Sequence, residues 1–304
     1  MYKSILEKNI KKEHIESLNK PIQILTNTNK FNINTDNMLL SNFFHTNGYI
    51  IIEDALDKIT IDLLKNDLDL LNQKDQNKYK NNKNRHTVHK CFFEKSPSMV
   101  QLIIDSKITD LCQYIIADGV GGRGNNLNAH LIHNNAFSIP SGGRGQAPTW
   151  HTDDAMQNII IEGDNILPNY IKLPVMVLTC MIWLSDCTDP CRGPTWVVPG
   201  SHRFGKKIDI DYANKNSIPM CGRSGTIVII NNQLWHKGSS NTSNIPRDTV
   251  QITFGRRIIS HMFNTIMDYK LPYHVLKLID QEPDEEKRNR AKERFGYLQG
   301  GAYS

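Results

Sequence analysis

The sequence of 304 residues lacks the features that direct a protein into a membrane, out of the cell or into a peroxisome. Its longest apolar run, residues 173–184, has 12 residues, whereas a membrane span needs about 20. The first 20 residues mix acidic and basic side chains and lack the apolar segment of a secretory signal. The sequence ends in Gly-Ala-Tyr-Ser rather than in a peroxisomal Ser-Lys-Leu. We therefore expect a soluble, cytoplasmic protein with no membrane partner.

Cysteine is too sparse to form the framework of a small secreted domain. Six cysteines are spread from Cys91 to Cys221, and no Cys-x-x-Cys pair is present. Such pairs are typical of zinc sites, and disulfides are typical of oxidising compartments. We therefore expect free thiols in a reducing compartment.

Charge of one sign is not in large excess. The chain has 36 Lys and Arg against 31 Asp and Glu, a formal net charge of +5. The most basic stretch, residues 74–90, is interspersed with Asn and Gln, a composition that indicates a solvated loop rather than a phosphate-binding patch. We expect no nucleic-acid partner.

A glycine-rich stretch at residues 119–124 fits the pattern G-x-G-x-x-G of dinucleotide-binding sites. In such sites a strand precedes the glycines and a helix follows them. Here the preceding residues have the periodicity of a helix and the following Asn-Asn-Leu-Asn is a poor helix start. We interpret the stretch as a flexible loop.

Apolar sequence, at 39% of the residues, suffices for a large packed core. The first third is predicted to contain a strand at 48–53 and helices at 59–71 and 97–117, from residue patterns with a strand period and a helix period. From residue 129 onwards, short β-rich runs alternate with Gly, Pro, Asn and Asp. These runs, at 129–138, 174–184, 194–198, 224–231 and 248–259, predict a sandwich or jelly roll.

Three side chains have the spacing of a metal site. His151 and Asp153 are two residues apart, so on an extended segment they point to the same side, whereas Asp154 points away. His236 follows a buried-looking strand at 226–230. Two imidazoles and one carboxylate on one face of an Fe(II) ion form the facial triad, which leaves other positions of the metal open. Arg247 follows 11 residues later, and its guanidinium is suited to holding a carboxylate with two hydrogen bonds.

These residues resemble the phytanoyl-CoA dioxygenase family of Fe(II)- and 2-oxoglutarate-dependent oxygenases. The resemblance is carried by Trp150-His151-Thr152-Asp153, by the Gly-Pro and Pro-Gly-Ser-His-Arg of residues 192–203, by Trp235-His236 and by Arg247, and it covers roughly residues 38–262. Residues 154–174 and 206–220 depart from the family pattern, close to where the family shapes its substrate pocket. We expect His202 to organise its turn rather than to bind metal.

The resemblance implies a set of cofactors and residues that bind them. Fe(II) is expected on His151, Asp153 and His236, with 2-oxoglutarate as cosubstrate and O2 as oxidant. Arg247 is expected to pair with the distal carboxylate of 2-oxoglutarate. Two further candidates for the cosubstrate site are Thr249, on the same strand face as Arg247, and Thr179, on a central strand.

The resemblance also implies a mainly β fold with added helices. We expect residues 1–37 to form an N-terminal extension and residues 38–304 to form one domain. Its core, at about 129–260, is expected to be a double-stranded β-helix of the jelly-roll or cupin-like type. Helices are expected to support this core on its N-terminal side and to form a tail at about 264–304.

The reaction implied is oxidation of an unactivated C–H bond of a small metabolite or biosynthetic intermediate, with release of succinate and CO2. Its outcome is hydroxylation, desaturation or oxidative ring closure. The carboxylate of Asp153 argues against a halogenase, which needs a small residue there so that halide can bind iron. Three alternatives stay open: an acyl-CoA 2-hydroxylase, a zinc hydrolase and a non-redox metal-binding barrel. We expect a small-molecule substrate and a monomer or homodimer.

Overall fold

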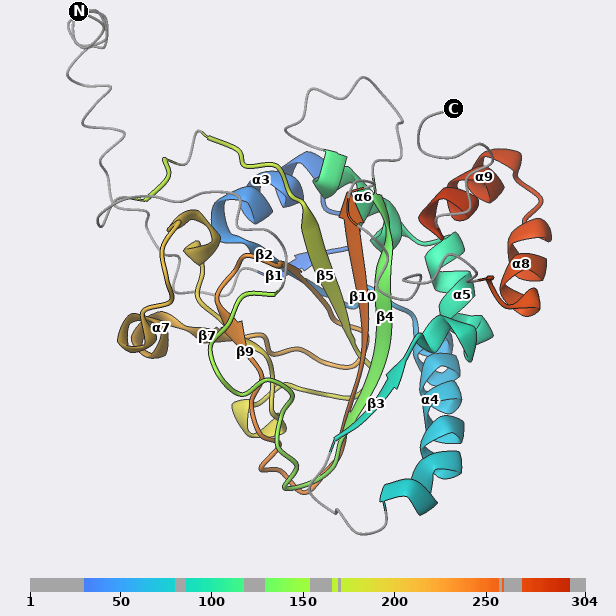
Figure 1. The fold of residues 1–304 in the computed structure, drawn as a ribbon, viewed down its shortest axis with the longest axis horizontal. Helices are drawn as coiled ribbons and strands as arrows, with labels where there is room; N and C mark the ends of the chain where they lie inside the picture. Colours follow the sequence, from blue (N-terminus) through green and yellow to red (C-terminus); the bar gives the residue numbers. More distant parts are fainter. Residues whose placement is uncertain are drawn as a thin grey trace, which may run out of the picture.

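The computed structural model describes residues 30–79, 86–117, 129–153, 166–168, 171–256, 259 and 270–295. In these ranges the strands form two sheets, and the larger has seven strands in the order β1-β2-β8-β5-β10-β4-β3 (Figure 1). These strands are β1 (Lys30–Asn32), β2 (Tyr49–Glu53), β3 (Thr87–Lys90), β4 (Ala129–Ile139), β5 (Val177–Trp183), β8 (Ile227–Asn231) and β10 (Arg247–Arg256). All their pairings are antiparallel except that of β1 with β2.

The smaller sheet lies across from the larger one and has the order β7-β6-β9. Its strands are β6 (Trp196–Val197), β7 (Ile218–Pro219) and β9 (His236–Lys237). An isolated antiparallel bridge between His151 and His236 extends it by one position. Two sheets that face each other in this way leave an interior between them.

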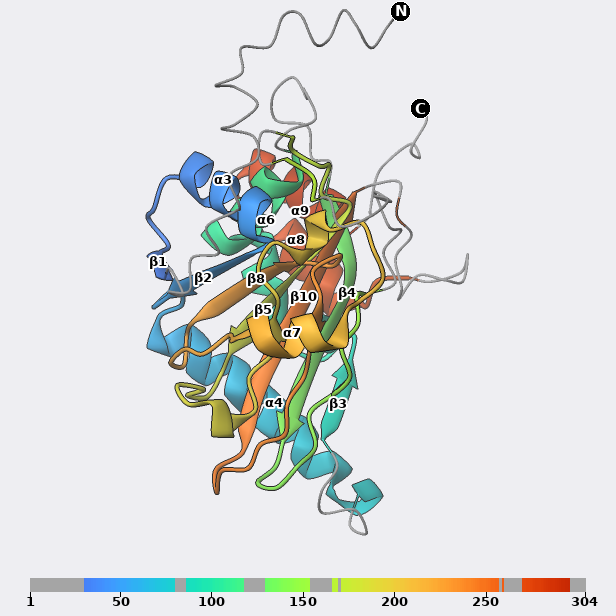
Figure 2. The same ribbon diagram turned by 90° about the vertical axis from the view of Figure 1, so that its left-hand side faces the viewer.

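Helices cover the outer face of the larger sheet. They are α3 (Asn37–Asn47), α4 (Lys58–Tyr79), α5 (Pro97–Ile104), α6 (Lys107–Ala117), α8 (Tyr273–Asp280) and α9 (Glu285–Arg294). Figure 1 shows α4, α5, α8 and α9 on one side of the long strands, with β9 and α7 (Ile210–Asn216) on the other. Figure 2, turned by 90°, places α7 in front of the strands.

The alternation of side chains along β5 divides the interior into two parts. Cys180 and Ile182 point outward into the main core, which they share with the helices. Met181 and Trp183 point inward, into a second cluster between the two sheets. Because side chains alternate along a strand, Thr179 also points inward, where it lines a cavity.

Several predicted elements are confirmed, with corrected boundaries. The helix predicted at 59–71 begins at Lys58, behind Asp57, whose side chain accepts a hydrogen bond from the Thr60 amide at 2.8 Å. This helix continues to Tyr79 and β3 covers Thr87–Lys90, so the loop predicted at 74–90 is wrong at both ends. Lys and Gln have good helix propensity, so the lack of apolar residues there did not end the helix.

The single helix predicted at 97–117 is two helices. The break falls at Asp105, which has an extended backbone, and at Ser106, whose hydroxyl accepts a hydrogen bond from the Thr109 amide at 3.1 Å. Asp and Ser compete in this way with the helical hydrogen bonds.

Other predictions differ from the structure at their edges or fall outside it. The sheet already includes Lys30–Asn32, before the predicted boundary at residue 37. The glycine-rich stretch at 119–124 lies outside the described residues. In the described ranges, no helix is both long and apolar enough to cross a membrane.

Candidate metal centre and adjoining pocket

Backbone hydrogen bonds bring His151, Asp153 and His236 together from distant parts of the chain. The amide of His151 donates to the carbonyl of His236 at 3.0 Å, and the amide of His236 donates back at 2.9 Å. The amide of Asp153 donates to the carbonyl of Asn232 at 3.0 Å. The small sheet therefore fixes the two histidines, and the turn after β8 of the larger sheet fixes Asp153 beside them.

The potential ligand atoms of these residues lie within 4.8 Å of one another. Asp153 Oδ1 is 3.6 Å from His236 Nε2 and 3.9 Å from His151 Nε2. Ligand atoms bonded to one metal ion at about 2.1 Å stand roughly 3–4 Å apart. The observed spacing is thus compatible with one shared ion.

The orientation of both imidazoles also fits the binding of a metal ion. His151 Nδ1 lies 2.8 Å from the carbonyl of Thr149, and His236 Nδ1 lies 2.8 Å from the carbonyl of Leu234. Because a carbonyl only accepts, each neutral imidazole carries its proton on Nδ1 and leaves the lone pair of Nε2 for a metal ion. This backbone contact is typical of metal-binding histidines, and the donor set of two imidazoles and one carboxylate fits Fe(II).

The charges of this cluster stabilise one another. Burial disfavours the charged carboxylate, yet the hydrogen bond to His236 and the charges of the histidines outweigh it and lower the pKa of Asp153. Burial likewise disfavours the charged form of His236, but the hydrogen bond to Asp153 and its charge raise the pKa of that imidazole. Without a metal, the carboxylate therefore favours protonation of His236; a divalent cation takes the place of that proton.

A cavity of about 130 Å³ opens beside the three residues. Arg247, Thr249 and Thr179 line it together with His151, Asp153 and His236. Apolar side chains of the larger sheet complete its walls: Phe137, Ile139, Met181 and Ile230. The structure thus brings all six predicted site residues to one pocket.

Arg247 is the charged group at one end of this pocket. It is only 7% exposed, and its guanidinium carbon lies 5.1 Å from the centre of the Trp183 ring. Nη1 is 3.4 Å from the hydroxyl of Thr249, while the buried Nε has no hydrogen-bond partner. No carboxylate of the described residues lies within 4.0 Å of it, and burial lowers its pKa. A buried cation with no carboxylate at ion-pair distance is suited to bind an anionic ligand.

Thr179 contributes to the site through Asn232. Its hydroxyl donates to Asn232 Oδ1 at 2.9 Å and lies 3.0 Å from the hydroxyl of Thr253. The carbonyl of Asn232 in turn holds Asp153. Asn232 is a site residue that the sequence analysis missed; the pair of asparagines at the end of the 226–230 strand was its only sequence signal.

The structure describes only one of the two segments that depart from the family pattern, residues 206–220, in full. The helix α7, within 206–220, packs on the outer face of the small sheet, where Tyr212 meets Phe204 and Trp235, and it does not line the pocket. Much of 154–174 lies outside the described residues. His202 is buried and its Nε2 lies 3.1 Å from the carbonyl of His45, away from the metal cluster.

Comparisons with known sequences match much of the chain to one family and to several curated proteins. The sequence model of the phytanoyl-CoA dioxygenase family matches residues 44–249. An uncharacterised protein of Mycobacterium tuberculosis is 27% identical over 138 residues, which are 45% of this chain and 47% of that protein. The ectoine dioxygenase of Sphingopyxis alaskensis is 24% identical over 179 residues, 50% of this chain and 52% of that enzyme. The chain thus spans about half the length of the curated relatives it matches.

Solved structures share the fold. HygX from Streptomyces hygroscopicus, crystallised with nickel and 2-oxoglutarate, superposes with a TM-score of 0.57 at 15% identity, over 73% of this chain and 88% of that one. The two facing sheets therefore form the jelly roll that the sequence predicted.

Proposed function

Because the chain belongs to the phytanoyl-CoA dioxygenase family of non-haem iron, 2-oxoglutarate-dependent oxygenases, we propose that it oxidises an unactivated C–H bond of a small metabolite or biosynthetic intermediate. Succinate and CO2 are the coproducts. One observation carries the proposal: a single cavity holds two histidines and one aspartate at ligand spacing, with a buried, unpaired arginine. A dicarboxylate that chelates the metal satisfies both ends of this cavity.

In this proposal the residues have distinct tasks. His151, Asp153 and His236 hold Fe(II) through the two Nε2 lone pairs and the carboxylate. Arg247 and the hydroxyl of Thr249 bind the distal carboxylate of 2-oxoglutarate, which supplies the missing counter-charge. When bound, Fe(II) with 2-oxoglutarate and O2 supplies the oxidising power for C–H cleavage.

The walls of the cavity serve the same reaction. Phe137, Ile139, Met181 and Ile230 exclude water from one side of the site. A dry wall strengthens the pairing between Arg247 and a carboxylate, because charges attract more strongly at low dielectric.

The proposed substrate is a small, polar molecule. The similarity to an enzyme named ectoine dioxygenase supports this size class. Screening metabolites for substrate-triggered succinate release identifies the compound. An acyl-CoA that triggered release more strongly than any small metabolite would contradict the proposed size class.

Replacing Asp153 tests the proposed chemistry. We expect Asp153→Ala to lose at least about 100-fold in succinate formation and most of its iron, because one of three ligands is gone. The matched control is Asp211→Ala, an exposed aspartate in the first turn of α7, which should keep wild-type activity and iron.

Metal analysis after anaerobic purification separates the alternatives. One equivalent of zinc without 2-oxoglutarate turnover would favour a hydrolase. Absence of bound metal would favour a non-redox barrel. Undiminished succinate formation by Asp153→Ala would contradict the assignment of His151, Asp153 and His236 as metal ligands.

A further inference from the structure

Arg192 directly precedes the Gly-Pro pair of residues 193–194 and lies outside the pocket. It ends the short 3-10 helix η2 (Pro190–Arg192) and is only 8% exposed. Its guanidinium donates to three backbone carbonyls: from Nε to Asp186 at 2.9 Å, from Nη1 to Ile245 at 3.3 Å and from Nη2 to Pro246 at 3.2 Å. Arg192 therefore ties the turn after β5 to the segment that enters β10.

The segment held by Arg192 leads directly to Arg247. Ile245 and Pro246 are the two residues before it, and Arg247 is the first residue of β10. On the β4 side, Arg247 pairs with Ile139, but the ladder with β5 begins only at Thr249. On that side the carbonyls of Ile245 and Pro246, although these residues are exposed, receive side-chain donors in place of the strand β5. Arg192 supplies them where the ladder stops.

A second side chain supports the same segment from the other side. Asn241 is fully buried, and its Nδ2 donates to Ile245 at 2.8 Å and to Ile139 at 3.2 Å. The carbonyl of Ile245 is thus shared among three donors, the third being the hydroxyl of Ser243 at 3.1 Å, whereas that of Pro246 receives the Nη2 of Arg192. The contact with Pro246, one peptide away from Arg247, is the one that depends on Arg192.

We propose that Arg192 is a positioning residue for Arg247: its guanidinium braces the entry of β10, so that the buried Arg247 meets the distal carboxylate of 2-oxoglutarate in a bidentate geometry. The inference rests on the proposed function, because it concerns the cosubstrate of that reaction. A bidentate pair requires two aligned hydrogen bonds, and a misplacement of about 1 Å far from the reacting atoms lowers rates by roughly 100-fold in other enzymes.

A role of the Arg192 charge and a role of its planar shape predict different 2-oxoglutarate affinities for two variants. Arg192→Lys keeps the charge, but an ammonium on one flexible stem cannot replace a rigid fork that reaches three carbonyls. Arg192→Gln loses the charge as well. If bracing is the role, both variants weaken 2-oxoglutarate binding, by roughly 10-fold. If the positive charge alone were responsible, Arg192→Lys would bind like the wild type.

The experiment is a calorimetric titration of 2-oxoglutarate into the Ni(II)-loaded full chain, with thermal unfolding to confirm that each variant is folded. We expect weaker 2-oxoglutarate binding in both Arg192 variants, unchanged Ni(II) affinity, and a raised KM for 2-oxoglutarate at nearly constant kcat. The matched control is Arg256→Gln. Arg256 ends β10 and also donates to a backbone carbonyl, that of Val175, at 2.9 Å, so its loss should affect stability without changing 2-oxoglutarate affinity.

Arg247→Gln separates the two proposals. If Arg247→Gln itself binds 2-oxoglutarate like the wild type, the proposed cosubstrate site is wrong. If Arg247→Gln is impaired while Arg192→Lys binds normally, or if Arg256→Gln weakens binding as much as Arg192→Gln, the bracing role alone is overturned.

Discussion

Single side chains in this protein repeatedly use backbone carbonyls to fix their position. His151 and His236 direct Nδ1 to the carbonyls of Thr149 and Leu234, and Arg192 binds three carbonyls. A carbonyl is a fixed acceptor wherever the fold is formed. The orientation of the site is therefore set by backbone geometry before any metal binds.

His202 makes the stability of the fold sensitive to acid. Burial lowers its pKa from 6.5 to about 3. Between these values the unfolded chain binds a proton at this position and the folded chain does not, so the free energy of unfolding decreases as the pH falls below 6.5. The decrease is about 1.4 kcal/mol at pH 5.5 relative to pH 7.5.

Urea denaturation of the metal-free protein at pH 7.5 and pH 5.5 measures this decrease. His202→Gln keeps a donor for the carbonyl of His45 but does not titrate. We expect the wild type to lose about 1.4 kcal/mol more than this variant over the same interval. Equal losses in both proteins would contradict the assignment of the buried neutral imidazole.

Among single residues, the sequence best predicted the site residues whose side chains can bind a metal ion or a carboxylate. His151, Asp153, His236 and Arg247 stood out because their residue types and spacing match a metal site and a carboxylate site. Asn232 did not stand out, because it acts through its backbone carbonyl, and every residue has one.

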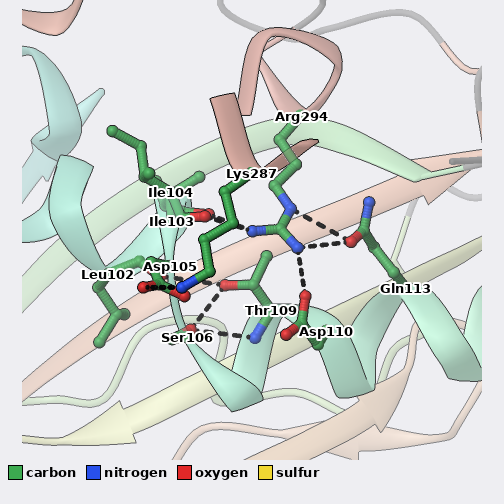
Figure 3. Close-up of polar contacts among 10 residues, drawn as sticks. All are labelled: Leu102, Ile103, Ile104, Asp105, Ser106, Thr109, Asp110, Gln113, Lys287 and Arg294. Atoms are coloured by element: carbon green, nitrogen blue, oxygen red, sulfur yellow. Dashed lines mark hydrogen bonds and ion pairs between the residues drawn. The ribbon is translucent and has the colours of Figure 1, made fainter. Parts of the chain in front are cut away.

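At the scale of elements, the C-terminal helix α9 is fastened to the break between α5 and α6. Figure 3 shows Arg294 reaching from α9 to the end of α5, beside the pair formed by Lys287 and Asp105. Arg294 is 1% exposed and donates to the carbonyls of Ile103 at 2.9 Å and Ile104 at 2.7 Å, and to Asp110 at 2.6 Å. These carbonyls lie in the last turn of α5, where intrahelical donors run out.

Removing this side chain should destabilise the fold. We expect Arg294→Met to lower the free energy of unfolding by roughly 2–4 kcal/mol, because two buried carbonyls lose their donor. Lys292→Gln is the control. Its pair with Asp280, at 3.4 Å, is partly exposed and should contribute less than about 1 kcal/mol. Urea denaturation of both variants gives the comparison, and equal small effects would show that α9 is held by other contacts.

The same contact explains why element boundaries were harder to predict than element types. The periodicity at 97–117 is helical throughout, and the break at Asp105 and Ser106 is completed by an arginine almost two hundred positions later in the chain. A local pattern contains no information about a donor supplied from that distance.

At the scale of the whole molecule, the proposed metal ion and 2-oxoglutarate contact residues from both sheets. The two histidines lie at the small sheet and Arg247 begins β10 of the larger sheet, so the proposed 2-oxoglutarate site spans the interior between them. A ligand that binds only the folded state stabilises it, by about 2.7 kcal/mol at 100 times its Kd.

Thermal unfolding tests this coupling. We expect Ni(II) to raise the Tm, and 2-oxoglutarate to raise it further by several degrees. Arg247→Gln should keep the increment from Ni(II) and lose most of that from 2-oxoglutarate, whereas EDTA should remove both. An increment from 2-oxoglutarate that survives in Arg247→Gln would place the cosubstrate elsewhere.

The sequence by itself predicted the chemistry proposed for this protein, because two histidines, one aspartate and one arginine at these spacings restrict the metal and the cosubstrate. Its short β-rich runs separated by turn residues also predicted a sandwich or jelly roll, and the family resemblance indicated the jelly roll. Only the tertiary structure decided which side chains support the site and fasten the helices. Arg192, Asn232 and Arg294 act through hydrogen bonds between segments far apart in the chain, and such contacts exist only after folding.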